Sequence, residues 1–423
     1  MTDQTIIVHA SELVTLKGPK RSRTKSEMSD LSIIKDGAIV LEDGAIADVG
    51  RTQSILKEHD ATGIERVDAS GKVVMPGFVD PHTHLVYAGS REFEIELKIK
   101  GKSYMEILAE GGGILRTVRD TRAASSQELY QQSARRLESM IAHGSTTIEA
   151  KSGYGLDLET EVRILETIAK LGEDYPADLV PTFMGAHATP PEFEGRPGDY
   201  VDFVADKVVP LVSARKLAQF CDVFCEKGAF TPDQSRRVLL AAKEHGMQLK
   251  VHADEFASSG GAELAAEVGA VSADHLAKPS DDGIMAMARK DVVGVLLPGT
   301  PFSSLSMEYA DGRRLIDLGV PVALATDLNP NCWNESMQFV ISLACYRMRM
   351  TPAEAITAAT INAAAALGMD KRIGSLERGK RADVLVMDVP SHAHIPYRFG
   401  TNLCSAVFKD GKKIWEKQPF RTA

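Results

Sequence analysis

The segment VMPGFVDPHTH (residues 74–84) joins a short apolar run to a His-x-His motif, and the prediction of the fold is built on it. A strand predicted at residues 77–80 ends just before His82 and His84. These two histidines stand two positions apart on extended backbone, so their side chains point to the same face. Two neutral imidazoles in this arrangement can bind one divalent metal ion. The His-x-His spacing alone is weak evidence for a metal site, since two polar loop residues give the same pattern. The position of the motif at the end of a barrel strand is what strengthens it.

Short apolar runs alternate with segments of helical period from residue 76 to residue 374, which is typical of a parallel sheet with crossover helices. Eight such units closed into a (β/α)8 TIM barrel fit this length, because barrels of this kind use about 250 residues. An open doubly wound sheet is the alternative, but no G-x-G-x-x-G follows the first strand. The strands are predicted at residues 77–80, 146–150, 179–184, 221–225, 248–252, 271–275, 292–297 and 322–326.

Capping sequences mark the starts of two helices in this region. TPDQ (231–234) is a capping box with proline at the first helical position, and its helix should stop before Gly246. TPAE (351–354) opens another helix, predicted to run to about Gly368. The buried stripe of a third helix is predicted to consist of Leu158, Val162, Leu165 and Ala169.

Both ends of the chain have the pattern of short strands joined by tight turns. The dipeptides Asp36-Gly37, Asp43-Gly44 and Asp410-Gly411 stand between apolar runs, which is a hairpin signal. We therefore predict an α/β protein with two domains. Residues 1–75 and 375–423 pair into one small β-sandwich-like domain, and residues 76–374 form the barrel.

Side chains that suit a metal or a catalytic site follow five of the predicted strands. In a (β/α)8 barrel, functional residues collect at the C-terminal ends of the strands. The His-x-His motif ends the first strand, and His187, His252, His275 and Asp327 end or follow the third, fifth, sixth and eighth. His252 and Asp327 would complete a shell of three histidines and one carboxylate around one metal ion. Water bound there ionises near neutral pH, and Glu255, His275 and Asp327 are the candidates for catalytic proton transfer.

Ordinary structural roles remain open for several of these residues. Glu255 could stabilise a helix N-terminus, and His275 could be a hydrogen-bonded core histidine. The chain has a second His-x-His, formed by His392 and His394, which lies beyond the barrel between two prolines. We interpret that motif as a surface segment.

The composition excludes several classes of protein and of partner. The 423 residues are 44% hydrophobic and 25% charged, which excludes collagen-like, disordered and coiled-coil chains. The net charge of −9, without a dense basic patch, gives no expectation of nucleic acid as a partner. No stretch approaches the roughly 20 apolar residues that span a bilayer, and the first residues lack signal-peptide features, so no membrane is expected. Five cysteines, an odd number, predict reduced thiols and a cytoplasmic protein.

The segment at residues 74–84 resembles the first barrel strand of the metal-dependent amidohydrolase superfamily. Longer stretches make the chain similar, more narrowly, to the imidazolonepropionase family, and the resemblance covers the barrel and both flanking β segments. These stretches are HTHLVYAGSR (82–91), GKSYMEI (101–107), GGGI (111–114), KSGYGLDLE (151–159), KVHADEF (250–256) and TDLNP (326–330).

The resemblance implies a fold, an activity and a set of site residues. The implied activity is the hydrolytic opening of a small molecule, 4-imidazolone-5-propanoate, to N-formimidoyl-L-glutamate in histidine degradation, by a homodimer with one zinc or iron ion per subunit. Lysines are absent from the ends of the third and fourth predicted strands, which favours one metal over a lysine-bridged pair. The implied metal ligands are His82, His84, His252 and Asp327. The implied substrate contacts are Arg91, Tyr104, Tyr154, His187 and Glu255, with product contacts at Asn329, Asn331 and Cys332.

Two details qualify these implied contacts. The guanidinium of Arg91 offers a planar fork for the propanoate of the substrate, although a surface charge would look the same in sequence. After Asp327, the family pattern continues with glycine and then serine or threonine, whereas this chain has Asn331 and Cys332. No base is spaced to activate the thiol of Cys332, so we do not expect it to act as a nucleophile.

Two other functions are weighed against this one. A purine or pyrimidine deaminase of the same superfamily would use nearly the same metal site and the same glutamate. Arg91 would then have no carboxylate to bind, since a nucleobase carries none. A non-catalytic barrel that scaffolds an assembly would be expected to have lost metal ligands, but all four are present.

Overall fold

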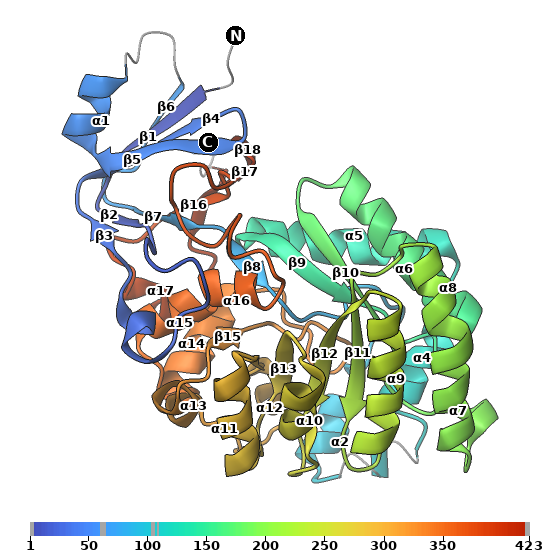
Figure 1. Cartoon of the computed structure of the whole chain (residues 1–423). Helices are drawn as coiled ribbons and strands as arrows, with labels where there is room; N and C mark the ends of the chain where they lie inside the picture. Colours follow the sequence, from blue (N-terminus) through green and yellow to red (C-terminus); the bar gives the residue numbers. More distant parts are fainter. Residues whose placement is uncertain (1–3, 60–64, 103–105, 108–109, 419–423) are drawn as a thin grey trace.

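A computed structural model of the chain describes residues 4–59, 65–102, 106–107 and 110–418. Figure 1 shows a barrel surrounded by helices, with smaller sheets from both ends of the chain beside it. The (β/α)8 barrel and the small β-rich unit predicted from the sequence are both confirmed.

The barrel consists of eight parallel strands that follow one another around the sheet in chain order. The ring closes beyond the last strand, where Asp327 N donates to His82 O (3.1 Å) and His84 N donates to Leu328 O (2.8 Å). Closure therefore takes place at the predicted metal motif. The strands are β8 (Phe78–Asp80), β9 (Ser145–Lys151), β10 (Asp178–Ala186), β11 (Phe220–Cys225), β12 (Gln248–Ala253), β13 (Ser272–His275), β14 (Val293–Leu296) and β15 (Val322–Leu324).

Helices cover the outside of the barrel (Figure 1). Among the described residues, none of them combines the length and the apolar character needed to cross a membrane. The helices of this region are α2 (Glu94–Ile99), α4 (Gly113–Ala123), α5 (Ser126–Ala142), α6 (Leu158–Asp174), α7 (Pro197–Phe203), α8 (Val209–Ala214), α9 (Pro232–Glu244), α10 (Gly261–Val268), α11 (Asp281–Lys290), α12 (Gly299–Ser303), α13 (Gly312–Leu318), α14 (Met337–Met348), α15 (Pro352–Ala358) and α16 (Ile361–Ala365), with the 3-10 turn η2 (Pro191–Phe193) and the π-helical η3 (Val204–Val208).

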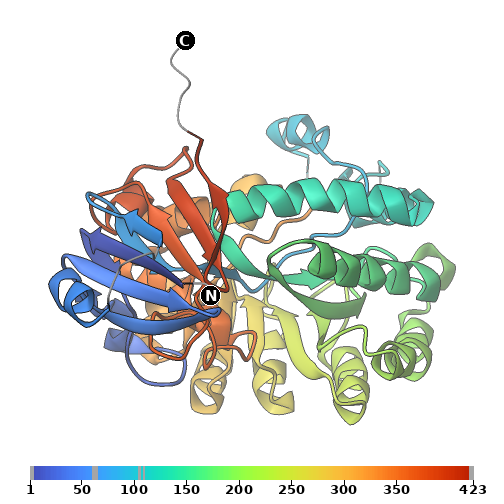
Figure 2. The same ribbon diagram turned by 90° about the horizontal axis from the view of Figure 1, so that it is seen from above.

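Two further sheets lie side by side in Figure 2; one consists of N-terminal strands only, and the other combines strands from both ends of the chain. The four-stranded sheet has the order β5-β4-β1-β6 and the six-stranded sheet the order β18-β17-β16-β7-β2-β3. Apolar side chains of both sheets form one core, as in a sandwich. The elements are β1 (Gln4–Ala10), β2 (Glu12–Val14), η1 (Lys25–Ser29), β3 (Ile33–Ile34), β4 (Gly37–Glu42), β5 (Ala45–Arg51), α1 (Thr52–Glu58), β6 (Glu65–Asp68), β7 (Val73–Pro76), β16 (Val384–Met387), α17 (His394–Tyr397), β17 (Cys404–Lys409) and β18 (Lys412–Glu416).

Two predictions about helices need correction. The helix predicted from residue 352 to about 368 is two helices, because the backbone leaves helical geometry at Thr360 and Ala359 O accepts a hydrogen bond from Val79 N of β8. The buried face of α6 also differs from the predicted one, and Ala169 is exposed. The carboxylate of Glu161 is drawn inside by backbone N–H groups of the preceding loop, which rotates the helix. The buried face consists of Thr160, Glu161, Ile164, Leu165, Thr167, Ile168 and Leu171.

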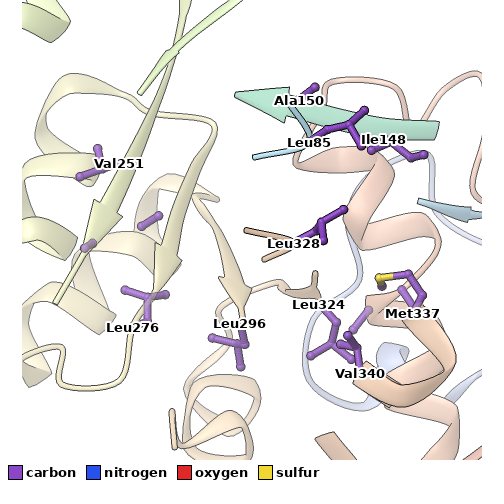
Figure 3. Packing of buried hydrophobic residues seen from close by; sticks show 14 of the residues in the cluster. Leu85, Ile148, Ala150, Val251, Leu276, Leu296, Leu324, Leu328, Met337 and Val340 are labelled. Atoms are coloured by element: carbon purple, nitrogen blue, oxygen red, sulfur yellow. The ribbon is translucent and has the colours of Figure 1, made fainter. Parts of the chain in front are cut away.

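Apolar side chains on the outward faces of the strands pack against the surrounding helices. Figure 3 shows Leu324 of β15 beside Met337 and Val340 of α14, all three completely buried. This packing holds the strands rigidly, so the side chains at their C-terminal ends are well positioned.

Gly77, between β7 and β8, allows the closest approach of the first barrel strand to the second. A Cβ atom here would lie 2.2 Å from Thr146 Oγ1 and 2.7 Å from its Cγ2. Gly77→Ala is therefore expected to lower the free energy of unfolding by about 1–3 kcal/mol, measured by urea denaturation. Thr146→Ala in the same chain should recover part of this loss. If the two substitutions were simply additive, the contact would not be the cause.

Candidate active site and metal centre

Three histidines meet at the C-terminal end of the barrel. His82 and His84 follow β8 and His252 lies in β12; one ring nitrogen of each lies within 4.8 Å of those of the other two. All three are at most 2% exposed. Residues far apart in the sequence are thus brought together because parallel strands end at the same rim.

Two carboxylates fix the orientation of two of these rings. His82 Nδ1 lies 2.6 Å from Asp274 Oδ2, and His252 Nδ1 lies 2.9 Å from Asp222 Oδ2. With Nδ1–H donated to a carboxylate, the lone pair of Nε2 faces the cluster. Among the described residues, His82 Nε2 is buried and has no hydrogen-bond partner. A buried imidazole nitrogen left in this way is suited to bind a metal ion.

Asp327 lies beside the histidine cluster. Its Oδ1 is 3.5 Å from His82 Nε2 and 3.9 Å from His84 Nε2, and its Oδ2 accepts a hydrogen bond from Thr300 Oγ1. The backbone of Asp327 has φ +51°, an uncommon conformation that turns the chain just after β15. Burial raises the pKa of this carboxyl. A cation between Asp327 and the histidines would compensate its buried charge.

The donor atoms of the cluster fit a divalent metal ion. Burial and the nearby Lys151 ammonium hold the pKa of His82 well below its usual range, and burial with the neighbouring His187 and His252 does the same for His84. Neutral imidazoles keep the lone pair that a metal needs. Three imidazoles and one carboxylate form a common donor set for zinc and iron.

Glu255 and His275 lie next to each other at the edge of the cluster. Glu255 Oε2 is 3.7 Å from His275 Nε2, and the Glu255 side chain is 13% exposed. Burial, together with the charges of Asp327 and Glu226, raises the pKa of Glu255 well above its usual range. His275 itself has φ +77°. A carboxyl with a raised pKa can both donate and accept a proton near neutral pH.

The loop that holds Glu255 is fixed by Glu226, which follows β11. Glu226 Oε2 accepts a hydrogen bond from Phe256 N (2.9 Å), and Glu226 Oε1 accepts one from Ser259 Oγ (2.7 Å). Glu226 is 3% exposed. This carboxylate was not among the predicted site residues, although it stands directly after a predicted strand.

His187 and Tyr154 form a second wall of the site. The ring of His187 stacks on that of His84 at 4.9 Å, and His187 Nδ1 lies 3.0 Å from Gly153 O. Burial and the neighbouring His252 lower the pKa of His187 to about 3, so this ring is neutral. The ring of Tyr154 lies 5.4 Å from that of His84 and 5.3 Å from that of His187.

Arg91 is buried, and its guanidinium pairs with a carboxylate of the chain itself. Arg91 Nε and Nη2 donate to the two oxygens of Glu94, each at 2.8 Å. Glu94 Oε1 also accepts a hydrogen bond from Gly113 N (2.8 Å). One edge of the Arg91 fork is therefore bound internally.

The predicted product contacts after β15 organise their own loop. Asn329 Oδ1 accepts hydrogen bonds from the backbone N–H groups of Asn331 and Cys332, at 2.8 and 3.0 Å. Asn331 Oδ1 accepts one from Lys98 Nζ of α2 at 2.6 Å. Burial raises the pKa of the Cys332 thiol, which agrees with the expectation that it is not a nucleophile.

Tyr104 lies outside the described residues. His392 Nδ1 lies 2.8 Å from Glu12 Oε2, so the second His-x-His belongs to the small β-rich unit.

A cavity of about 120 Å³ adjoins the cluster on the side of Glu255 and His275. Lys278, Pro298 and Thr300 also line it. A small ligand could therefore reach Glu255 from this side.

Comparisons with known proteins show the family of the chain. Residues 73–414 match the amidohydrolase family. The chain is 53% identical over 409 residues to an imidazolonepropionase of Geobacillus kaustophilus, covering 96% of both chains. It is 49% identical over 415 residues to an imidazolonepropionase of Alkaliphilus metalliredigens, covering 97% of this chain and 98% of the relative.

Solved structures resemble the chain in fold. Guanine deaminase of E. coli has a TM-score of 0.76 at 15% identity, covering 98% of this chain and 99% of its own. A 5-methylcytosine deaminase from Klebsiella pneumoniae has a TM-score of 0.74 at 16% identity, covering 99% of this chain and 100% of its own. At these identities the likeness shows a common architecture alone.

Proposed function

The chain belongs to the imidazolonepropionase family of amidohydrolases, and on this basis we propose that His82, His84, His252 and Asp327 bind one zinc or iron ion. It is a hydrolase of a cyclic amide C–N bond, which opens 4-imidazolone-5-propanoate to N-formimidoyl-L-glutamate in histidine degradation. The observation that carries the proposed site is the meeting of three buried imidazoles within 4.8 Å.

The proposed chemistry depends on what each side chain can do at this centre. A divalent ion bound there would lower the pKa of a water ligand to about 7, far below that of bulk water, and would so supply a nucleophile at neutral pH. Asp327 accepts the hydrogen bond of Thr300 through Oδ2, which leaves Oδ1 toward the histidines. His275 lies against His82, with ring centroids 5.4 Å apart, and can orient the group that attacks the ring carbonyl.

Glu255 carries the proton in this proposal. Its raised pKa lets it take a proton during attack and return it to the leaving ring nitrogen, so that the C–N bond can break. Neutral His187 donates to Gly153 O through Nδ1, so its Nε2 can only accept a hydrogen bond, while Tyr154 provides an aromatic surface for the ring of the substrate.

Enzyme assays test this function directly. The purified protein, containing about one metal ion per chain, should convert 4-imidazolone-5-propanoate, followed by loss of the ring absorbance and by NMR of the product. Adenine, guanine and cytosine should release no ammonia under the same conditions. Rapid ammonia release from a nucleobase, with no opening of the imidazolone, would favour the deaminase alternative.

We propose that Arg91 binds the propanoate of the substrate. Arg91→Met is expected to raise KM by about 10–100-fold with a smaller change in kcat, because a hydrogen bond to a charged group contributes about 1.5–3 kcal/mol. Steady-state kinetics measure this split.

The buried partner of Arg91 calls for a control, since the single substitution leaves Glu94 without its cation. Arg91→Met/Glu94→Gln removes that charge and keeps an acceptor for Gly113 N. The higher KM should persist in the double variant. A return of KM to the wild-type value would show that the stranded carboxylate, and not the loss of the fork, caused the effect.

Three wider proposals follow from the sequence and the fold. The boundaries of the two domains are residues 1–75 with 375–423, and 76–374, supported by the six-stranded sheet that joins both chain ends. A cytoplasmic location is supported by five free cysteines. A homodimer, expected from the family, is to be tested by sedimentation equilibrium.

A further inference from the structure

A group of fully buried charged side chains lies beneath the histidines, inside the barrel. Lys151, at the end of β9, has no exposed surface, and its Nζ lies 2.8 Å from Glu149 Oε1 and 2.7 Å from Asp222 Oδ2. The same Nζ lies 3.6 Å from Asp274 Oδ2. All three carboxylates are themselves completely buried.

Two of these carboxylates are the ones that orient the proposed metal ligands. Asp222 accepts a hydrogen bond from His252, and Asp274 accepts one from His82. One ammonium group from β9 therefore contacts the supports of two histidines that come from different strands. Among the described residues, the ion pairs of Lys151 give the shortest link between Asp222 and Asp274.

Stability alone does not account for a charged group at this position. The interior of a (β/α)8 barrel is commonly filled by Val, Ile and Leu, and replacing a buried ion pair by apolar side chains is often neutral or stabilising. Here Lys250 adds a second buried ammonium, 3.2 Å from Glu149 Oε1 and 2.8 Å from Pro81 O. Three carboxylates and two ammonium groups leave one net negative charge beneath a site suited to a cation.

We propose that Lys151 is a positioning residue of the metal centre, which holds Asp222 and Asp274 together and through them fixes His252 and His82 with Nε2 toward the metal. The proposal rests on the metal site proposed above. Without the ammonium, two buried carboxylates repel each other across the barrel, and the hydrogen bonds to both rings lose their fixed geometry. Lys151 therefore acts on metal affinity through two ligands at once.

Lys409 provides a matched control. Its side chain is 4% exposed, and its Nζ lies 2.9 Å from Asp178 Oδ2 and 2.7 Å from Asp383 Oδ2, so it too is a buried ammonium between two carboxylates. Asp178 begins β10, at the end of the barrel opposite to the histidines. Arg381 also contacts both carboxylates, so loss of Lys409 should lower stability less than loss of Lys151, and it should not affect the metal.

The experiment compares wild type, Lys151→Met and Lys409→Met. Each protein is stripped of metal and titrated with Co²⁺ in competition with a chromophoric chelator, and the visible spectrum of the Co²⁺-loaded protein is recorded. Lys151→Met is expected to weaken metal affinity by about 10–100-fold and to change the Co²⁺ absorption bands. Lys409→Met should lower the Tm of the metal-free protein without changing affinity or spectrum.

If Lys151→Met had the metal affinity and the spectrum of the wild type, and the wild type bound metal normally, the proposed role of Lys151 would be wrong. The proposed metal centre would not be affected by that result. Failure of the wild-type protein to bind about one metal ion per chain would overturn the metal centre, and this inference with it. If Lys151→Met is not recovered as a folded protein, Lys151→Gln removes the charge while keeping N–H donors, and the same comparison decides.

Discussion

His252→Ala is expected to be purified without bound metal and to lose at least about 10³-fold in kcat/KM for the imidazolone, which corresponds to about 4 kcal/mol of transition-state stabilisation. The substitution removes one of three converging imidazoles and leaves Asp222 without the ring that it orients. Elemental analysis of the purified protein gives the metal content, and steady-state kinetics give the loss of activity.

His392→Ala is the matched control for this experiment. His392 also pairs through Nδ1 with a carboxylate, that of Glu12, but it lies in the small β-rich unit. It should keep full metal content and activity. If His252→Ala kept both its metal and its turnover, the proposed metal centre would be wrong.

Glu255→Gln is expected to lower kcat by about 10²–10⁴-fold while the metal content stays unchanged. The amide has nearly the same shape as the carboxylate, but it cannot take up a proton and return it. Glu255 contacts His275 at 3.7 Å and is not one of the four proposed metal ligands. The metal should therefore still bind. Single-turnover kinetics would place the loss in the chemical step.

Glu308→Gln separates this effect from a general change of the cavity. Glu308 lines the same cavity, but it is largely exposed and lies 2.8 Å from Lys278 Nζ. Its replacement should leave kcat within about twofold. Equal losses in the two variants would argue against a proton-carrying role for Glu255.

The barrel could be predicted because local signals and overall topology agree. Apolar runs alternate with segments of helical period, and each of the eight predicted ranges overlaps an observed strand. The Asp43-Gly44 and Asp410-Gly411 turns were equally clear, since both residues of each adopt positive φ, as tight hairpins require. Once the barrel is assigned, the strand ends bring the histidines together.

The supports of the histidines could not be predicted. Asp222 and Asp274 lie within strands, where an isolated acidic residue has no distinctive pattern. Their contacts depend on the register between strands, in which His252 is paired with Phe224 on one side and with Asp274 on the other. Register across a barrel is set by the packing of the whole sheet. The contacts of Lys151 could not be predicted for the same reason.

Other differences arise from local competition between backbone and side chains. Glu161 is buried because it accepts hydrogen bonds from Gly155 N (2.8 Å) and Leu156 N (2.9 Å), which moved the buried face of α6 away from Ala169. The pairing of Arg91 with Glu94 follows the spacing of three residues and could have been anticipated.

The closure of the barrel between β8 and the segment after β15, here called the seam, has a consequence for biosynthesis. Asp80 and Thr326, which are bonded across that seam, stand 246 positions apart. A ribosome adding roughly 5–20 residues per second needs about 12–50 s to make the intervening chain. During that time the nascent polypeptide carries two of the proposed metal ligands, His82 and His84, without Asp327. If the proposed metal centre is correct, stable binding of the ion must therefore wait until translation has nearly finished.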